Sequence, residues 1–297
     1  MRLSNVVLAA AGLSLALLAG CTGSDPAPAP SSSEPGPPPP MANAGPPADP
    51  MAGGGPVPPP ATGALIGAWV NPGPLSQPSR IAAVQRLEGR IGRRLDIINT
   101  YRKWEDRFFT QSDLAFMKRG SILMLSWAGP DSRAVTLGRH DNLIRARARQ
   151  VAADGRPVLL RYRWEMDRPN LRASMWSGAD FVAAWKHVRR IFAEEGATNA
   201  AWVWCPTAEG FAGGYAPDFY PGDDQVDWLC VDVYAGRSPT PLSELLAPFL
   251  SWSAPRPKPI IIGEFGVSRA YPSARRAEWL RAAAETFRTS GQIKAVS

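Results

Sequence analysis

Two glutamates at the ends of apolar segments are the residues of this sequence best suited to chemistry. Glu165 ends the segment 158–165 (VLLRYRWE), and Glu264 ends the segment 259–264 (PIIIGE). Two carboxyl groups hydrolyse a glycosidic bond when one protonates the leaving oxygen and the other acts at the anomeric carbon. The pair therefore predicts glycoside hydrolysis, provided that the fold brings both residues to one pocket.

The residues around Glu165 bear on whether it could hold a proton near neutral pH, as the acid must. Trp164 and Met166 flank it, and an apolar setting raises the pKa of a carboxyl group by desolvation. Arg161 or Arg163 would lower that pKa instead. The setting of Glu165 could therefore help it to hold a proton near neutral pH, and we expect Arg161 to support the site.

Polar residues on the segment 228–234 are placed to assist a nucleophilic carboxylate. Asp232 and Tyr234 alternate with valines, which puts both on one face of a strand. A tyrosine hydroxyl there would hold a carboxylate ionised and oriented. Gly263 precedes Glu264 and would let backbone and substrate approach closely.

Short apolar runs alternate with helical patterns from residue 64 onward, which is typical of a parallel α/β sheet. The 234 residues of 64–297 are close to the length of about 250 that is usual for a (β/α)8 TIM barrel. Strand tips surround one pocket in that fold, and Glu165 and Glu264 would follow strands four and seven. The eight expected strands are 65–70, 95–100, 122–127, 158–164, 201–205, 228–234, 259–263 and 293–296.

Two helical patterns support the barrel. Apolar residues recur at helical spacing over 181–192, with Asp180 near the start, and Trp185 is expected in the core. Ser273 is expected to cap a second helix, whose Trp279 also belongs to the core. The eighth strand comes so near the last residue that the barrel reads as C-terminally short.

Tryptophans near the expected strand ends suit a carbohydrate cleft, because flat sugar faces stack on aromatic rings. Packing in the core is the alternative for each of them, and for Trp202 and Trp204 the two readings are balanced. The expected substrate-binding residues are Trp69, Trp127, Trp164 and Trp204.

The N-terminal 63 residues indicate export. Arg2 and the apolar run 6–18 read as a signal peptide over 1–20, and Leu-Ala-Gly-Cys at 18–21 resembles a bacterial lipobox with Cys21 as the lipidated residue. An ordinary secretory signal is the alternative. Residues 21–63 are rich in Pro, Ala, Gly and Ser, which predicts a disordered linker. We expect a lipid-anchored, extracytoplasmic bacterial protein with its catalytic domain over 64–297.

Neither the distribution of charge nor the spacing of possible metal ligands predicts a nucleic-acid partner or a metal site. Residues 1–63 carry one basic and three acidic side chains, so the remainder of this chain of net charge +7 is formally +9. The excess is spread over the expected helices, as on a solvated outer ring. His140 and His187 read as helix-surface residues, and no metal spacing is present. We expect a monomer without metal or cofactor that binds polysaccharide, and a membrane through its lipid, but no nucleic acid.

Two cysteines, Cys205 and Cys230, lie on expected neighbouring strands. A disulfide is allowed outside the cytoplasm, but the geometry of neighbouring strands does not favour one. The sequence leaves their redox state open.

Four blocks in order resemble glycoside hydrolase family 26, whose members include β-mannanases, within the clan of retaining (β/α)8 glycosidases. The resemblance spans most of 64–297 and implies Glu165 as acid/base, Glu264 as nucleophile and Tyr234 as the nucleophile's hydrogen-bond partner. The blocks are RYRWEMD (161–167), NAAWVWCP (199–206), YPGDDQVDW (220–228) followed by DVY (232–234), and KPIIIGEFG (258–266).

One departure concerns substrate. Family mannanases have His-Glu-Met-Asn at the acid/base, whereas Trp164 stands in the histidine position here. The expected function is retaining endo-hydrolysis of a β-1,4-linked polysaccharide, β-mannan first, with mixed-linkage β-glucan or β-xylan as alternatives. An inactive carbohydrate-binding or polysaccharide-assembly lipoprotein is the alternative from another class.

Overall fold

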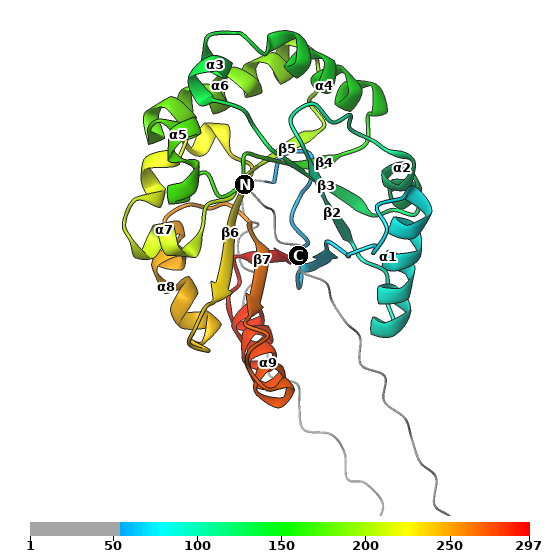
Figure 1. The fold of residues 1–297 in the computed structure, drawn as a ribbon, viewed down its shortest axis with the longest axis vertical. Coiled ribbons are helices and arrows are strands. Elements are labelled where there is room, and N and C mark those ends of the chain that lie inside the picture. Colours follow the sequence, from blue (N-terminus) through cyan, green and yellow to red (C-terminus); the bar gives the residue numbers. More distant parts are fainter. Residues whose placement is uncertain (1–53) are drawn as a thin grey trace, which may run out of the picture. The chain divides into compact units, whose positions relative to one another are not determined.

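A computed structural model of the protein describes residues 54–297, which form a closed barrel of parallel strands (Figure 1). Each strand pairs with the next along the chain, and β8 closes the barrel on β1. The (β/α)8 prediction is therefore confirmed. The strands are β1 (Leu65–Ala68), β2 (Ile97–Arg102), β3 (Ile122–Trp127), β4 (Val158–Tyr162), β5 (Ala200–Trp204), β6 (Trp228–Ala235), β7 (Ile260–Val267) and β8 (Ile293–Val296).

Helices follow the strands and cover the outside of the barrel (Figure 1). Ser177 caps α6 by accepting a hydrogen bond from the Asp180 amide. We predicted that Ser273 would cap α9, but Ser273 is the first residue of that helix and Pro272 occupies the capping position. The helices are α1 (Gln77–Ile91), α2 (Gln111–Lys118), α3 (Ser132–Thr136), α4 (Asp141–Asp154), α5 (Arg172–Met175), α6 (Gly178–Glu194), α7 (Ala208–Ala212), α8 (Leu242–Ser253) and α9 (Ser273–Thr289), with 3₁₀ turns at Pro169–Leu171, Ala216–Phe219 and Asp223–Gln225.

Alternation along the strands divides the apolar side chains into two layers. One layer fills the barrel, where Met124, Leu159 and Ile261 pack together. The other lies between strands and helices and holds Trp185 and Trp279, both buried as predicted. Successive strand residues point to opposite sides, so each strand supplies both layers.

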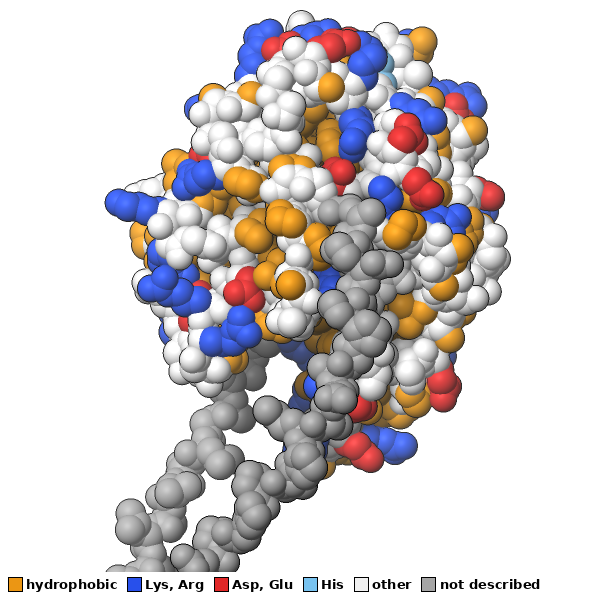
Figure 2. Space-filling model, turned by 180° about the vertical axis from the view of Figure 1, so that it is seen from behind, with side chains coloured by type: hydrophobic (Ala, Val, Ile, Leu, Met, Phe, Trp, Pro, Cys, Tyr) orange, Lys and Arg blue, Asp and Glu red, His pale blue; other side chains and the backbone are white. Residues whose placement is uncertain are grey.

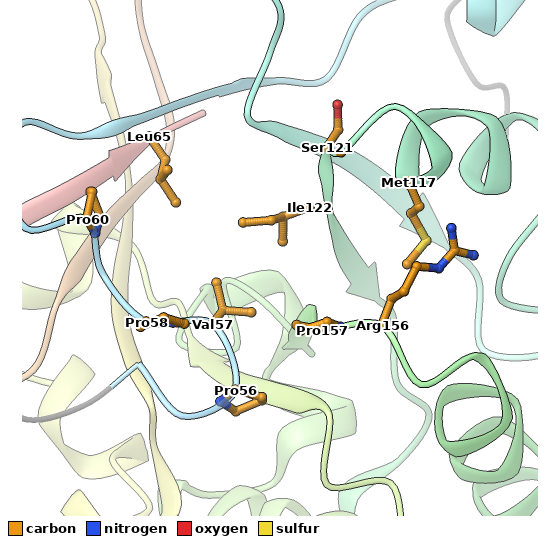
Figure 3. A pocket seen from close by; sticks show the side chains of 11 residues that line it. Pro56, Val57, Pro58, Pro60, Leu65, Met117, Ser121, Ile122, Arg156 and Pro157 are labelled. Atoms are coloured by element: carbon orange, nitrogen blue, oxygen red, sulfur yellow. The ribbon is translucent and has the colours of Figure 1, made fainter.

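The N-terminal end of the barrel is covered by a segment that we predicted to belong to the linker. Val57 is buried in one cluster with the first residues of three strands, namely Leu65, Ile122 and Trp228. Figure 3 shows Val57 near Leu65 and Ile122. The Trp228 indole donates to the Val57 carbonyl oxygen at 2.9 Å, and an apolar cavity of about 360 Å³ lies beside this contact. The predicted domain boundary at residue 64 is therefore wrong, because residues 54–60 belong to the folded domain.

A chain that begins at residue 64 is expected to be less stable than one that begins at residue 54. It loses the buried Val57 side chain and the acceptor of the Trp228 indole, which together are worth about 2–3 kcal/mol in free energy of unfolding. Urea denaturation of the two chains measures the difference. Pro58→Ala in the longer chain is the control, because Pro58 is exposed; equal midpoints would show that the segment contributes nothing.

Basic side chains on the outer helices lie among acidic and apolar ones on the face that Figure 2 shows. Arg145 and Arg149 on α4 pair with Glu195, and Arg190 on α6 pairs with Glu194. The arginines are therefore distributed over the helices, and several of them pair with neighbouring acids.

Among residues 54–297, no helix has the length and apolarity needed to cross a membrane. The predicted signal peptide, the lipidation residue Cys21 and most of the predicted linker lie outside the described residues.

Candidate active site

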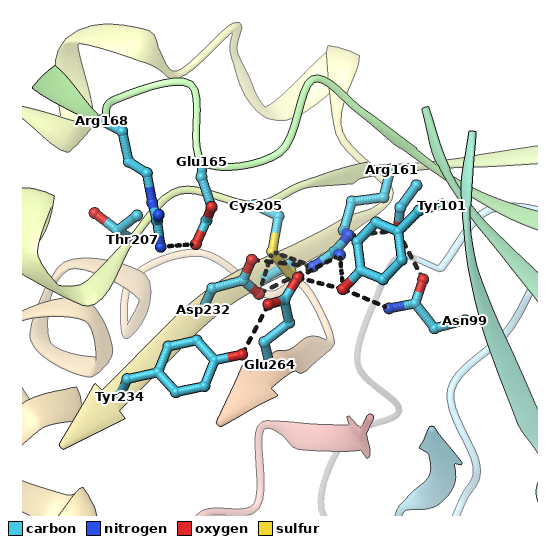
Figure 4. Close-up of polar contacts among 12 residues, drawn as sticks. Asn99, Tyr101, Arg161, Glu165, Arg168, Cys205, Thr207, Asp232, Tyr234 and Glu264 are labelled. Carbon is cyan, nitrogen blue, oxygen red and sulfur yellow. Dashed lines mark hydrogen bonds and ion pairs between the residues drawn. A yellow bond between two sulfur atoms is a disulfide. The ribbon is translucent and has the colours of Figure 1, made fainter. Parts of the chain in front are cut away.

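Three carboxyl groups meet at the C-terminal end of the barrel (Figure 4). Glu165 follows β4, Asp232 lies on β6 and Glu264 on β7, and one oxygen of each lies within 4.8 Å of the other two. The barrel therefore brings together the two glutamates that the sequence places 99 residues apart, as predicted.

A β-bulge turns Glu264 into the barrel. Val231 on β6 pairs with Ile262, but Asp232 pairs with Glu264, so Gly263 is an extra residue on β7. Strict alternation after the inward Ile261 would point Gly263 inward and Glu264 outward. Because of the bulge, the Glu264 side chain lies on the same side as Asp232.

Three donors hold the Glu264 carboxylate. The Tyr101 hydroxyl at 2.6 Å and the Arg161 guanidinium at 2.8 Å both donate to Oε1, and the Tyr234 hydroxyl donates to Oε2 at 2.8 Å. Burial works against ionisation, but the Arg161 charge and these hydrogen bonds outweigh it and hold the pKa of Glu264 below its ordinary value. Glu264 is therefore ionised near neutral pH, and hydrogen bonds to both of its carboxylate oxygens fix its orientation.

Arg161 connects Glu264 to Asp232 in the buried floor of the site. Its Nη1 donates to both Asp232 oxygens at 3.0 and 3.1 Å, and its Nε donates to Ser126 at 2.8 Å. One guanidinium cannot neutralise two carboxylates, and complete burial raises the pKa of Asp232 well above its usual range. The three carboxyls resemble a metal ligand set, but the Arg161 guanidinium lies between Asp232 and Glu264 as their cation.

Glu165 lies on a tightly wound loop three residues beyond β4. Arg163 and Glu165 have φ angles of 51° and 54°, which cost non-glycine residues about 1–3 kcal/mol each. The Glu165 amide donates to the Cys205 carbonyl at 2.7 Å, which fixes the loop to the end of β5. Asp167 strengthens this attachment by accepting from the Thr207 amide and hydroxyl.

The protonation of Glu165 contrasts with that of Glu264. Burial raises the pKa of Glu165 to about 7, against the opposing charge of Arg168, and the negative charge of Glu264 adds to the rise. At neutral pH the site thus holds one carboxyl that can carry a proton beside one that does not. That combination is what a proton donor and a nucleophile require.

Tyr101 is a residue of the site that the sequence did not reveal. We predicted that the second strand ends at residue 100, whereas β2 continues to Arg102. Tyr101 pairs with Ser126 on β3, and Ser126 pairs with Arg161 on β4, so the three share one layer. Alternation of Asn99 and Tyr101 could have indicated this inward face.

Two of the four predicted substrate-binding tryptophans lie at the site. Trp69 follows β1, is 48% exposed and meets the Tyr101 ring edge-on at 6.2 Å between centroids. The Trp164 ring also lies against the Tyr101 ring, at 5.2 Å between centroids. Trp69 and Tyr101 also line a cavity of about 180 Å³ beside Glu264 and Tyr234.

The predictions for Trp127 and Trp204 are wrong. Both side chains are completely buried between strands and helices, together with Trp202. The neighbours Ser126 and Cys205 face the barrel interior, so alternation turns both tryptophans outward. The Trp127 indole donates to the Trp104 carbonyl and the Trp204 indole to the Phe219 carbonyl, which completes their role as core residues.

The two cysteines form a disulfide beneath the site, with an S–S distance of 2.16 Å. The expectation from neighbouring-strand geometry is therefore wrong. Register explains the pairing, because Trp204 pairs with Leu229, so Cys205 and Cys230 are the next residues opposite one another, and both face inward.

The two histidines lie in the outer helical layer, as predicted. His140 precedes α4 and accepts from the Trp104 indole, and His187 on α6 contacts Asp141.

Replacing Gly263 by alanine is expected to disturb the whole network. A Cβ atom there would lie 2.6 Å from Asp232 Oδ1 and 2.8 Å from Arg161 Nη1, closer than real contacts allow. We expect a loss of about 1–3 kcal/mol of stability together with at least a tenfold fall in kcat. Thermal unfolding and turnover measure both effects; Gly291→Ala, at an open position, is the control, and an unchanged kcat in Gly263→Ala would contradict the close fit.

Paired carboxyls at the strand tips of a (β/α)8 barrel define a glycosidase-type site, and comparison with known proteins agrees. The chain is 29% identical over 250 residues to endoglucanase H of Acetivibrio thermocellus, covering 77% of this chain and 27% of that protein. It is 30% identical over 144 residues to β-1,3-xylanase TXYA of a Vibrio species, covering 46% and 29%. The chain thus spans less than a third of the length of either curated relative.

Solved structures share the fold. A β-mannanase from a symbiotic protist of the termite Reticulitermes speratus matches with a TM-score of 0.56 at 16% identity, and a GH26 β-mannanase from Bacteroides ovatus with 0.55 at 18%. Each match covers 79% of both chains. No protein-family model matches the chain. The chain therefore shares its (β/α)8 fold with β-mannanases of glycoside hydrolase family 26, in agreement with the resemblance that the sequence blocks indicated.

Proposed function

We propose that this chain is a retaining endo-β-glycanase that hydrolyses a β-1,4-linked polysaccharide. Glu165 protonates the glycosidic oxygen while Glu264 attacks the anomeric carbon, which breaks the bond to the leaving sugar and forms a glycosyl ester. Glu165 then removes a proton from water, which attacks the anomeric carbon of the glycosyl ester and releases the Glu264 carboxylate. The atoms balance, since one water adds across each bond that is broken.

The separation of the two carboxyls carries this proposal. Retaining enzymes hold their carboxyl groups about 5–5.5 Å apart, whereas inverting enzymes hold them about 6.5–9.5 Å apart to admit a water. Oxygens of Glu165 and Glu264 lie within 4.8 Å of each other. The gap is suited to direct attack on a sugar carbon.

Product stereochemistry tests the mechanism. Proton NMR recorded in the first minutes of hydrolysis should show the β-anomer, which equilibrates slowly to the mixture. The α-anomer as first product would exclude double displacement.

The backbone sugar is proposed from the relatives. The two similar structures reported above are β-mannanases by their descriptions, so β-1,4-mannan is the first candidate. The curated relatives carry the names of an endoglucanase and a xylanase. A panel of mannan, mixed-linkage glucan and xylan, assayed by new reducing ends, decides among them; binding without new ends on every polymer would favour a carbohydrate-binding protein.

The location of the enzyme is a further part of the proposal. The sequence over 1–21 supports lipidation at Cys21 and an extracytoplasmic, membrane-anchored protein. Metabolic labelling with a radioactive fatty acid should mark the protein, and Cys21→Ser should abolish the label.

A further inference from the structure

At the mouth of the site, an arginine forms an ion pair with Glu165, the proposed proton donor. Arg168 Nη2 is 2.5 Å from Glu165 Oε1, and the Arg168 side chain is 45% exposed (Figure 4). The proton donor adjoins the leaving sugar, because it protonates the oxygen that departs with that sugar. Arg168 therefore lies on the leaving-group side of the bond to be broken.

Arg168 differs from the other guanidinium that acts on Glu165. Arg161 is completely buried, and each of its nitrogens donates to a neighbour in the floor of the site. Within residues 54–297, the contact with Glu165 is the one hydrogen bond found for the Arg168 guanidinium. An exposed guanidinium has five donors, so most of those on Arg168 remain available to a ligand.

A guanidinium with open donors suits a particular kind of ligand. Carboxylates match its planar fork through two parallel hydrogen bonds, whereas neutral hydroxyls do not. The excess of positive charge over 64–297 attracts polyanions in general, but only a residue beside the cleavage point can select where such a polymer is cut.

We infer that the enzyme prefers an anionic β-glycan, in which Arg168 binds an acidic group on the sugar at the leaving-group side. This inference rests on the proposed function, because it concerns the same cleavage. Neutral glycan remains a slower substrate.

The same contact would assist the proton donor. Burial raises the pKa of Glu165 and the Arg168 charge opposes that rise. An acidic group that draws Arg168 away removes the opposing charge, so Glu165 holds its proton better in the complex than in the free enzyme.

A matched pair of polymers tests the inference. β-1,4-Mannan and the same mannan partly oxidised to carboxylates at C6 differ in charge but not in linkage. We expect the wild-type enzyme to cleave the carboxylated polymer with about tenfold higher kcat/KM. Because the leaving sugar becomes the new non-reducing end, mass spectrometry should find carboxylated sugars enriched at those ends.

Variants separate a specific contact from general charge attraction. Arg168→Met should abolish the tenfold preference and the enrichment while still cleaving neutral mannan. Arg172→Met, which removes an equal charge from an exposed arginine four residues away, should retain both. Equal rates for the two polymers in the wild type, or a preference that survives Arg168→Met, would overturn the inference.

Failure of the proposed function would look different. If neither polymer were cleaved, catalysis would be wrong, and calorimetric binding of the same two polymers would decide about Arg168 separately. Tighter binding of the carboxylated polymer that Arg168→Met abolishes would support the inference, and equal affinity would refute it.

Discussion

Replacing Glu264 by alanine is expected to lower kcat by at least about 10⁴-fold, because no other carboxylate is placed to form the glycosyl ester. The remaining candidate, Asp232, is completely buried and paired with Arg161. The fold should survive, since the variant leaves one guanidinium facing one carboxyl in place of two. Turnover of mannan with circular dichroism as a check on folding makes the measurement.

A matched control strengthens this result. Glu105→Ala removes an exposed glutamate from the loop after β2 and should leave kcat unchanged. Azide added to Glu264→Ala should give a glycosyl azide of inverted configuration, because azide then takes the place of the nucleophile. More than a tenth of the wild-type activity in Glu264→Ala would rule out its assignment.

Replacing Glu165 by alanine is expected to lower kcat on polysaccharide by about 10²–10⁴-fold, the usual contribution of a general acid. A substrate with a good leaving group, such as a nitrophenyl glycoside, needs less protonation and should lose much less. Azide should rescue this variant and give a glycosyl azide of retained configuration. A rescue with inverted configuration would exchange the two assigned roles.

The dependence of kcat/KM on pH should report the ionisation of Glu165. The enzyme needs Glu165 protonated, and its pKa is raised to about 7, so kcat/KM should fall as the pH rises through about 7. The pKa of Glu264 is lowered, so the acid limb should lie below the ordinary range of a glutamate. Glu165→Ala should lose the alkaline limb; a limb that persists would belong to another group.

Sequence reasoning succeeded where the signal was local. Periodicity gave the eight strands of the described barrel, with the bounds of β3 and β8 as predicted, and placed both glutamates at one end. Trp127 and Trp204 were wrongly predicted to bind substrate, because residue type was given more weight than strand alternation. Ser126, next to Trp127, is a polar residue that already indicated which position of β3 faces the barrel interior.

Contacts across the barrel were beyond a single sequence. Val57 lies in a proline-rich stretch whose composition predicts disorder, yet it packs against strand residues far along the chain. Tyr101 reaches Glu264 over 163 positions, and the disulfide depends on the register of β5 against β6. Such contacts follow from the closure of the sheet and not from any local pattern.

The extra residue at 263 makes the site depend on a bulge in β7 and not on simple alternation. If β7 kept Gly263 but lost the bulge, every residue of the motif would be unchanged, yet alternation would point Glu264 outward from the barrel. A comparison of letters would still report an intact nucleophile. The pairing register that β7 keeps with β6 after Ile262 is therefore a stricter criterion for activity in related sequences than the presence of the glutamate itself.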